Sequence, residues 1–373
     1  MISRREIFTG AGAAALLAGC RKKRNTGLRA YAFVANQEGR AIAAVDLSAF
    51  AVARHIPLDG EPTEVIAPAT HPLVFALTPA SGSLHAISLE HLKFQRTLRL
   101  GAYAKKMLHM PETGSLYVLL DSPRKLVRVS LDRFAVDWEL PLPEGAIDFD
   151  LTPERLGKAA VLFGGGQFAT VDLAERKVNP MVNLGSELGA LRFQSNGEAF
   201  LVSDLSAKSL HVFDTASVKK VVELPLAVRP ENLCFSADGG QLFVTGTGAD
   251  VVCVVYPYYT PQVAETVLAG RAPAAMAASR DPRYLFVANP LSGDVSILNV
   301  RDRKMVAVVS VGAEPRYITV TPDSQYALVL NRKSGDMAVL RIGGIQRNRQ
   351  KSAGLFTMIP VGSAPVSAAI RMV

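Results

Sequence analysis

A short apolar segment with an aromatic or β-branched centre recurs eight times along this chain of 373 residues, at intervals of 39 to 44 residues. The centres of the eight copies are Phe33, Phe75, Tyr117, Val161, Phe200, Phe243, Phe286 and Leu328. A nearly constant period of this length indicates an array of equivalent units, each of which buries its apolar surface against its neighbours. The repeat therefore constrains the fold before any single residue is interpreted.

Each unit is expected to contain four short strands, and residues 273–311 show this most clearly. Four apolar runs, at 274–278, 284–289, 295–300 and 305–311, are separated by polar turns that contain Gly, Pro, Asp or Ser. Runs of β-branched and aromatic residues between such turns are typical of strands. Four-stranded units repeated in this way predict the blades of a β-propeller.

The two ends of the chain predict that the array closes into a ring. The chain enters the repeat at a second strand, near Tyr31, and finishes with a lone first strand at residues 366–373. An unpaired edge strand is a liability, and pairing the last strand with the first three removes it. We therefore predict an all-β fold, a single eight-bladed β-propeller of four-stranded blades over residues 30–373, closed by the C-terminal strand.

Several of these segments resemble the YVTN-repeat β-propellers. The resemblance rests on residues 285–289 (Leu-Phe-Val-Ala-Asn), 295–299 (Val-Ser-Ile-Leu-Asn) and 314–323, which begin Glu-Pro-Arg-Tyr. It covers nearly all of residues 30–373 and is weakest between residues 100 and 195. The resemblance implies a propeller fold and export but says little about activity, because one fold hosts many functions. Many members of that family have seven blades, so seven blades are the alternative.

The N-terminus is typical of an export signal. Arg4 and Arg5 precede a short apolar run, and residues 17–20 (Leu-Ala-Gly-Cys) resemble the lipobox of bacterial lipoproteins. The resemblance implies cleavage before Cys20 and lipidation of its thiol. We therefore expect a signal peptide at 1–19, a lipidated Cys20 with a basic tether at 20–29, and the propeller at 30–373. Residues 3–8 also resemble a twin-arginine signal, which leaves the export route open.

Most of the net charge of +8 lies in the tether. The body from Ala30 onward carries only +2, which is too little for a nucleic-acid-binding surface, so no nucleic-acid partner is expected. The basic tether suits an anionic membrane surface beside an acyl chain. Arg21 after Cys20 resembles the outer-membrane sorting pattern, which implies a bacterial cell envelope protein facing the periplasm or the cell surface.

Aligned first strands predict the residues around the channel mouth. Their beginnings include a set of charged and polar side chains, namely Glu64, Lys106, Asp148, Glu231, Asn232, Arg316 and Tyr317. Oxygen ligands such as those of Glu64, Asp148 and Asn232 suit a hard divalent cation. An ammonium at Lys106 opposes a cation, so a mixed, solvated rim is the alternative to a metal site and the one we favour.

One row deeper, the aligned positions are mostly apolar or small, apart from Asp150 and Arg192 in adjacent units. A lone charge is costly on an inner strand. We therefore predict an ion pair between Asp150 and Arg192 across a blade boundary, acting as a structural latch; a site deep in the channel is the alternative.

Two functions remain open at this point. The first is a non-catalytic binding or scaffold protein, anchored to the membrane by its lipid, with an unidentified protein or small-molecule partner. The alternative is a hydrolase of lactonase-like type at the channel mouth. The sequence contains no nucleophile elbow, haem-attachment motif or phosphate loop, so we expect no catalytic residue and no cofactor, with a divalent cation as the weaker possibility.

Overall fold

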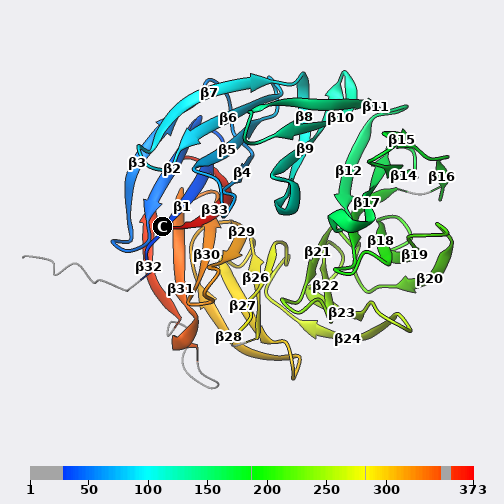
Figure 1. Ribbon diagram of the computed structural model, residues 1–373. Helices are drawn as coiled ribbons and strands as arrows, with labels where there is room; N and C mark the ends of the chain where they lie inside the picture. The colour runs from blue at the N-terminus through cyan, green and yellow to red at the C-terminus, as the bar shows by residue number, and fades with distance from the viewer. Residues whose placement is uncertain (1–27, 186, 282, 346–353) are drawn as a thin grey trace, which may run out of the picture.

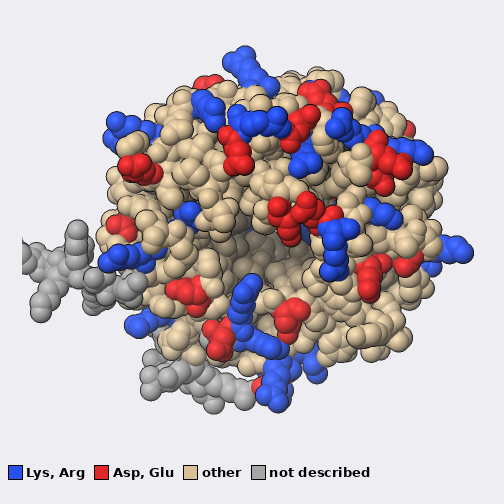
Figure 2. All heavy atoms as spheres, viewed as in Figure 1, with Lys and Arg blue, Asp and Glu red and all other residues tan. Residues whose placement is uncertain are grey.

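The computed structural model describes residues 28–185, 187–281, 283–345 and 354–373. These residues form an all-β ring of eight sheets arranged around a central axis (Figure 1), and Figure 2 shows a hollow at the centre of one face. We number the blades 1 to 8 and name their strands first to fourth from the channel outward. The eight-bladed prediction is confirmed, and the seven-bladed alternative is wrong.

Blades 1 to 4 follow the predicted order. Blade 1 contains β33 (Pro365–Met372), β1 (Ala30–Asn36), β2 (Ala41–Asp46) and β3 (Ala51–Pro57). Blade 2 contains β4 (Glu64–Ile66), β5 (Leu73–Thr78), β6 (Ser83–Ser88) and β7 (Lys93–Arg99). Blade 3 contains β8 (Ala102–Met110), β9 (Ser115–Ser122), β10 (Arg124–Ser130) and β11 (Ala135–Pro141). Blade 4 contains β12 (Ala146–Leu151), β13 (Lys158–Phe163), β14 (Gln167–Asp172) and a divided outer strand, β15 (Lys177–Val178) and β16 (Val182–Asn183).

Blades 5 to 8 complete the ring. Blade 5 contains β17 (Leu188–Phe193), β18 (Ala199–Asp204), β19 (Ser209–Asp214) and β20 (Lys220–Pro225). Blade 6 contains β21 (Asn232–Phe235), β22 (Leu242–Thr245), β23 (Val251–Tyr256) and β24 (Gln262–Leu268). Blade 7 contains β25 (Met276–Ala278), β26 (Tyr284–Asn289), β27 (Asp294–Asn299) and β28 (Lys304–Ser310). Blade 8 contains β29 (Pro315–Val320), β30 (Tyr326–Asn331), β31 (Asp336–Arg341) and β32 (Leu355–Pro360).

The described part of the chain also contains three short 3-10 turns, η1 (Pro111–Thr113), η2 (Glu154–Leu156) and η3 (Ile342–Gly344). Among the residues that the structure describes, none of the helices has the length and apolar character that crossing a bilayer requires. The predicted signal peptide, Cys20 and most of the basic tether lie outside the described residues.

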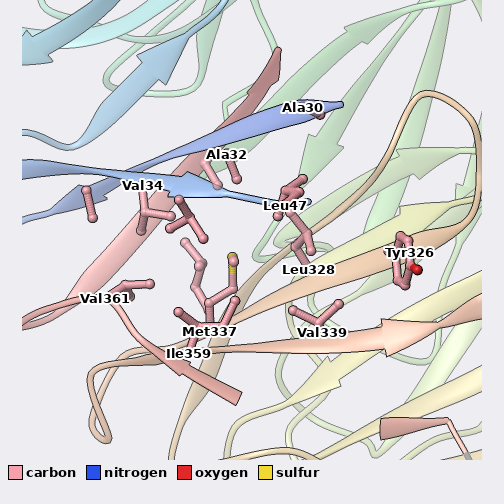
Figure 3. Packing of buried hydrophobic residues seen from close by; sticks show 14 of the residues in the cluster. Ala30, Ala32, Val34, Leu47, Tyr326, Leu328, Met337, Val339, Ile359 and Val361 are labelled. Carbon is pink, nitrogen blue, oxygen red and sulfur yellow. The ribbon is translucent and has the colours of Figure 1, made fainter. Parts of the chain in front are cut away.

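The apolar core lies between the blades rather than within one sheet. The middle strands of each blade are buried on both faces, as in β5, all six residues of which are buried. A strand covered on both faces is expected to be mostly apolar, as β5 is, whereas the outer β7 (Lys-Phe-Gln-Arg-Thr-Leu-Arg) is largely exposed. Figure 3 shows one such layer, in which Val34 of β1 lies across from Met337 of β31 and Ile359 of β32, between blades 1 and 8.

In blades 1, 7 and 8 an asparagine ends the second strand and packs closely against a glycine of a connection between blades. Asn331 donates from Nδ2 to Oδ1 of Asp336 at 2.6 Å, across the turn between the second and third strands. Gly312 lies directly against this amide, and a Cβ at Gly312 would come within 2.5 Å of the Asn331 Nδ2. Gly270 approaches Asn289 in the same way. The glycine in each connection is therefore required by close packing.

The strand order gives the ring two distinct faces. Connections from second to third strands, and from one blade to the next, lie on one face, which we call the top face. The bottom face carries the other connections and both ends of the described chain, where the Val373 amide donates to the Arg29 carbonyl at 2.9 Å. The chain thus enters the ring from the bottom face.

We expect removal of residues 366–373 to lower the melting temperature of the whole ring. The deletion strips the first strand from blade 1 and exposes the inner edge of β1, which pairs with β33 from Ala30 to Asn36. Thermal unfolding followed by circular dichroism measures the effect. Deletion of Val373 alone, which is 68% exposed, is the matched control and should change little. An unchanged melting temperature after the longer deletion would contradict ring closure.

Candidate functional site

The predicted mouth residues lie at or beside the first strands, around the hollow at the centre of the ring. Figure 2 shows this hollow in one face, with acidic and basic side chains close to its rim. The structure divides the predicted residues into two groups. Glu64, Lys106 and Asp148 belong to a hydrogen-bonded belt on blades 2 to 5, whereas Glu231 and Arg316 line a separate cavity over blades 6 to 8.

Asp148 on β12 is the centre of the belt. Its Oδ1 accepts a hydrogen bond from Lys106 Nζ at 2.7 Å, and its Oδ2 accepts one from Arg192 Nη1 at 3.0 Å. Lys106 also donates to the Phe149 carbonyl at 2.8 Å. The Asp148 side chain is only 12% exposed, so the two cations offset the cost of burying its charge. One carboxylate therefore connects blades 3, 4 and 5.

Oxygen-bearing side chains on first strands accept backbone hydrogen bonds from a neighbouring blade. The Met107 amide donates to Glu64 Oε2 at 2.7 Å, the Leu191 amide to Asp148 Oδ2 at 3.0 Å, and the Phe193 amide to Asp150 Oδ2 at 2.8 Å. Ser367 does the same across the ring closure, since its Oγ accepts from the Val65 amide at 3.4 Å. These side chains satisfy amide groups at the channel-facing edge of the neighbouring blade.

The predicted ion pair between Asp150 and Arg192 is corrected in one respect. Arg192 does cross the boundary between blades 4 and 5, but its ion pair is with Asp148. Aligning the repeats predicts the position of a residue along its strand, but it does not predict which side chain of the neighbouring blade that residue contacts. Leu191 donates its amide to Asp148, which brings the adjacent Arg192 side chain to the same carboxylate. Asp150 instead accepts the Phe193 amide, and burial raises its pKa.

Glu64 is a carboxyl of the belt whose pKa is strongly raised. Desolvation by burial is the main cause that raises its pKa to about 7. The Met107 amide and the Lys106 ammonium lower the pKa, while the nearby Asp148 carboxylate raises it. Glu64 therefore exchanges a proton near neutral pH, unlike an ordinary surface glutamate.

Tyr317 and Asn232 lie on the first strands of blades 8 and 6. The Tyr317 hydroxyl donates to the Ala368 carbonyl at 2.9 Å, and burial raises the pKa of this phenol. Asn232 begins β21 opposite Thr245. The described residues contain no group of three His, Cys, Asp or Glu side chains that could hold a metal ion. In the belt, both Asp148 oxygens accept hydrogen bonds from protein groups.

The second group lines an open cavity of about 520 Å³ on the top face. Glu231 and Arg316 belong to its lining, and Ala272, Pro273 and Ala274 of the connection into blade 7 lie between them in the chain. Glu231 Oε1 accepts the Thr247 hydroxyl at 2.8 Å, and Arg316 Nε donates to Glu314 at 2.9 Å. The volume lies in the range of small-molecule sites.

Sequence reasoning missed two features of this site. It did not single out Ser367, although the aligned row places this residue beside Glu64 across the closure. It also did not anticipate Leu291, an exposed apolar side chain at 69% that lines the cavity. The spacing of 43 residues between each carboxylate and the amide that it accepts is the signal that could have found the backbone contacts.

Comparison with solved structures agrees with the propeller fold. The chain is similar to the dihydro-heme d1 dehydrogenase NirN in complex with DHE (TM-score 0.74, 14% identity, 91% of this chain and 74% of that chain). It is also similar to apo AztD from Citrobacter koseri (TM-score 0.68, 13% identity, 92% and 98%). A functionally unknown protein from Desulfotomaculum acetoxidans gives a TM-score of 0.59 at 14% identity over 92% and 99%. No protein-family model and no curated protein matches the sequence. At these identities the similarity shows an eight-bladed β-propeller fold alone.

The raised pKa of Glu64 predicts a pH-dependent stability. Between pH 4.5, the ordinary pKa of a glutamate, and about pH 7, the folded state holds a proton on Glu64 that the unfolded state has released. The stabilisation that this proton gives is therefore fully present below pH 4.5 and is lost as the pH rises through 7. Glu64→Gln keeps an oxygen for the Met107 amide but cannot ionise. In the unmodified protein, the free energy of unfolding should fall by about 3 kcal/mol as the pH rises from 4.5 to 7, at about 1.4 kcal/mol per pKa unit. This fall should be absent in the Glu64→Gln variant.

Urea unfolding at pH 5 and pH 8 measures this difference between Glu64→Gln and the unmodified protein. The exposed Glu61→Gln is the matched control and should leave the pH dependence unchanged. An equal decline in stability in the Glu64→Gln variant would contradict the role assigned to this carboxyl.

Asp148→Ala is expected to destabilise the ring strongly. The change leaves the Lys106 and Arg192 cations without their shared counter-charge in a partly buried site, which costs about 3–5 kcal/mol. Adding Lys106→Met and Arg192→Leu should recover most of the loss. Chemical denaturation of the single and triple variants measures both effects.

Asp137→Ala provides the matched control for that experiment. Asp137 is 16% exposed and also pairs with two cations, Arg128 at 3.5 Å and Arg133, but the Arg133 side chain is 70% exposed. Water replaces a lost partner at such a surface, so the cost should be about 1 kcal/mol or less. Equal losses at Asp137 and Asp148 would show that the belt has no special structural role.

Proposed function

We propose that this chain is an exported, lipid-anchored β-propeller that acts as a non-catalytic binding or scaffold protein at the bacterial cell envelope. The observation that carries the binding role is the contrast between the two groups of channel residues. The belt side chains are engaged with one another and with neighbouring backbone, whereas Glu231 and Arg316 line an open cavity of about 520 Å³.

The cavity has the mixed chemistry of a ligand site. Leu291, Pro290 and the alanines of the connection into blade 7 supply apolar surface, while Glu231 and Arg316 supply opposite charges. A largely apolar concavity with a few polar groups is typical of small-molecule sites. We infer that the top mouth binds a small molecule or a short segment of a partner protein.

The export and anchoring proposals rest on the N-terminal sequence. The lipobox-like residues 17–20 and the YVTN-like repeats support them, together with the basic residues that follow Cys20. The described chain enters the ring at the bottom face, near Arg29. A lipid on Cys20 would therefore hold the bottom face toward an outer membrane and leave the top cavity open to the periplasm or the cell surface.

Cys20→Ala is expected to move the protein from the membrane fraction to a soluble fraction, or to leave the signal uncleaved, because the acyl chains alone would hold it. Membrane fractionation followed by immunoblotting measures the change. Cys234→Ala, a cysteine within β21, is the matched control and should remain with the membrane. A Cys20→Ala protein that still sediments with the membrane would disprove the lipid anchor.

The same preparations test the hydrolase alternative. Purified protein is incubated with a simple lactone, with and without Ca²⁺, and the release of acid is followed. A non-catalytic binding protein shows no release above the uncatalysed rate. Turnover that requires Ca²⁺ and is lost in Glu64→Gln would overturn the binding proposal in favour of the channel-mouth hydrolase.

A further inference from the structure

The turns between third and fourth strands share a rare backbone conformation. In seven blades of the described chain, one residue other than glycine has a φ between 48° and 57° in this turn. These residues are Phe50, Leu92, Phe134, Arg176, Val218, Tyr259 and Arg303. The left-handed region is unfavourable for a residue with a Cβ, so the surrounding structure must hold each of them in place.

In six of these turns the side chain contacts the preceding blade. Phe50 lies 4.8 Å from the Phe356 ring, Phe134 lies 5.8 Å from Phe75, and Arg176 lies over the Trp138 ring. Arg303 donates from Nη1 to the Tyr256 hydroxyl at 2.8 Å, and Leu92 and Val218 pack into the clusters shared with blades 1 and 4. The repeated conformation therefore serves to dock one blade onto the next.

Tyr259 of blade 6 breaks this rule. Its side chain is fully exposed, at 105% of the reference area, and projects from the bottom face. The docking contact to blade 5 is made by its neighbours instead. The Tyr258 hydroxyl lies 2.9 Å from Ser195 Oγ, and Gln194 donates from Nε2 to the Pro257 carbonyl. The loop is thus fixed to blade 5 while the Tyr259 side chain remains uncovered.

A shallow groove of about 230 Å³ runs beside this tyrosine, which we call the Tyr259 groove. Its apolar wall includes Pro257, Tyr258, Tyr259, Pro261 and Val221, of which Val221 is 55% exposed. The volume is below the range of drug-sized ligands, and it suits one or two side chains of an extended peptide.

The charged lining of the groove has one sign. Of the described residues that line it, Glu198 and Asp214 carry charge, and both are acidic. A hydrogen bond from the Ser217 hydroxyl is the main cause that lowers the pKa of Asp214, which keeps this carboxylate ionised. Glu198 accepts from Asn196 Nδ2 at 2.8 Å, which orients it beside the groove. The groove therefore combines an aromatic and proline wall with fixed negative charge.

We propose that the Tyr259 groove binds an extended, proline-rich segment of a partner protein that carries an arginine. Aromatic walls accept polyproline helices, whose preformed shape lowers the entropy lost on binding. An arginine on the segment would pair with Glu198 or Asp214 in a charge-assisted hydrogen bond. The groove lies on the bottom face, so this surface is distinct from the top cavity and does not depend on the function proposed for that cavity.

Isothermal titration calorimetry with the full-length chain tests the proposal. The probe is the peptide Pro-Pro-Pro-Arg-Pro-Pro-Pro-Arg-Pro-Pro, compared with a second peptide in which alanine replaces both arginines. We expect Tyr259→Ser to weaken binding of the first peptide about tenfold, as loss of an aromatic anchor does. Glu198→Gln should weaken it about threefold and reduce its salt dependence, with little effect on the second peptide.

Tyr103→Ser is the matched control. Tyr103 is also an exposed tyrosine, at 61%, with a positive φ of 53°, but it lies on the top side of blade 3. Its loss should leave peptide affinity and melting temperature unchanged, and Tyr259→Ser should also keep the melting temperature.

Four results would overturn the proposal. They are no heat of binding at about 1 mM peptide, equal weakening by Tyr103→Ser, a dimer in sedimentation that Tyr259→Ser abolishes, and binding to anionic lipid vesicles that requires Tyr259. The last two would assign the groove to a second copy of the chain or to the membrane.

Discussion

Antiparallel pairing between β1 and β33 is the constraint on which the rest of the structure depends. It joins Ala30 to Met372 and Phe33 to Ala369, so the two ends of the described chain complete one sheet. Every other blade is built from strands that follow one another in sequence. Only the closing blade combines strands from both ends of the described chain. Its formation therefore has the largest cost in loop-closure entropy of any blade in the ring. Asn36 adds a second link, donating from Nδ2 to the Val361 carbonyl at 2.7 Å.

Closure also explains the chemistry inside the channel. In a ring, every first strand has its inner edge next to another first strand that it cannot pair with as a sheet. Some of its amides are therefore left without a strand partner, and polar side chains of a neighbouring blade accept them. Glu64, Asp148, Asp150 and Ser367 all act in this way. Glu64 and Asp148, which the sequence suggests as oxygen ligands, therefore also help to pack one blade against the next.

The fold could be predicted from the sequence because its main determinant is a spacing. The interval between second strands fixes the number of blades, and the strand at which the chain begins and ends fixes the closure. The partner of Arg192 could not be predicted in the same way. Alignment placed Asp150 and Arg192 on neighbouring blades, yet Asp148, two residues away on the same strand, receives the guanidinium. Which carboxylate Arg192 contacts depends on how far blade 5 is shifted along the channel relative to blade 4, and the repeat pattern contains no information on this shift. The exposure of Tyr259 could not be predicted for the same reason, since the side chains of the six equivalent residues contact the preceding blade.

The two faces of the ring then divide the proposed interactions. The described chain enters at the bottom face, and a fully extended tether of residues 20–29 spans roughly 35 Å at most. A lipid on Cys20 would keep the bottom face within that distance of the bilayer, while the top cavity opens on the opposite side of the ring. A small ligand of the top cavity would then bind without competition from the membrane. A partner at the Tyr259 groove would have to reach the membrane-facing side, so an extended segment suits this site better than a folded domain, because it fits between the ring and the headgroups.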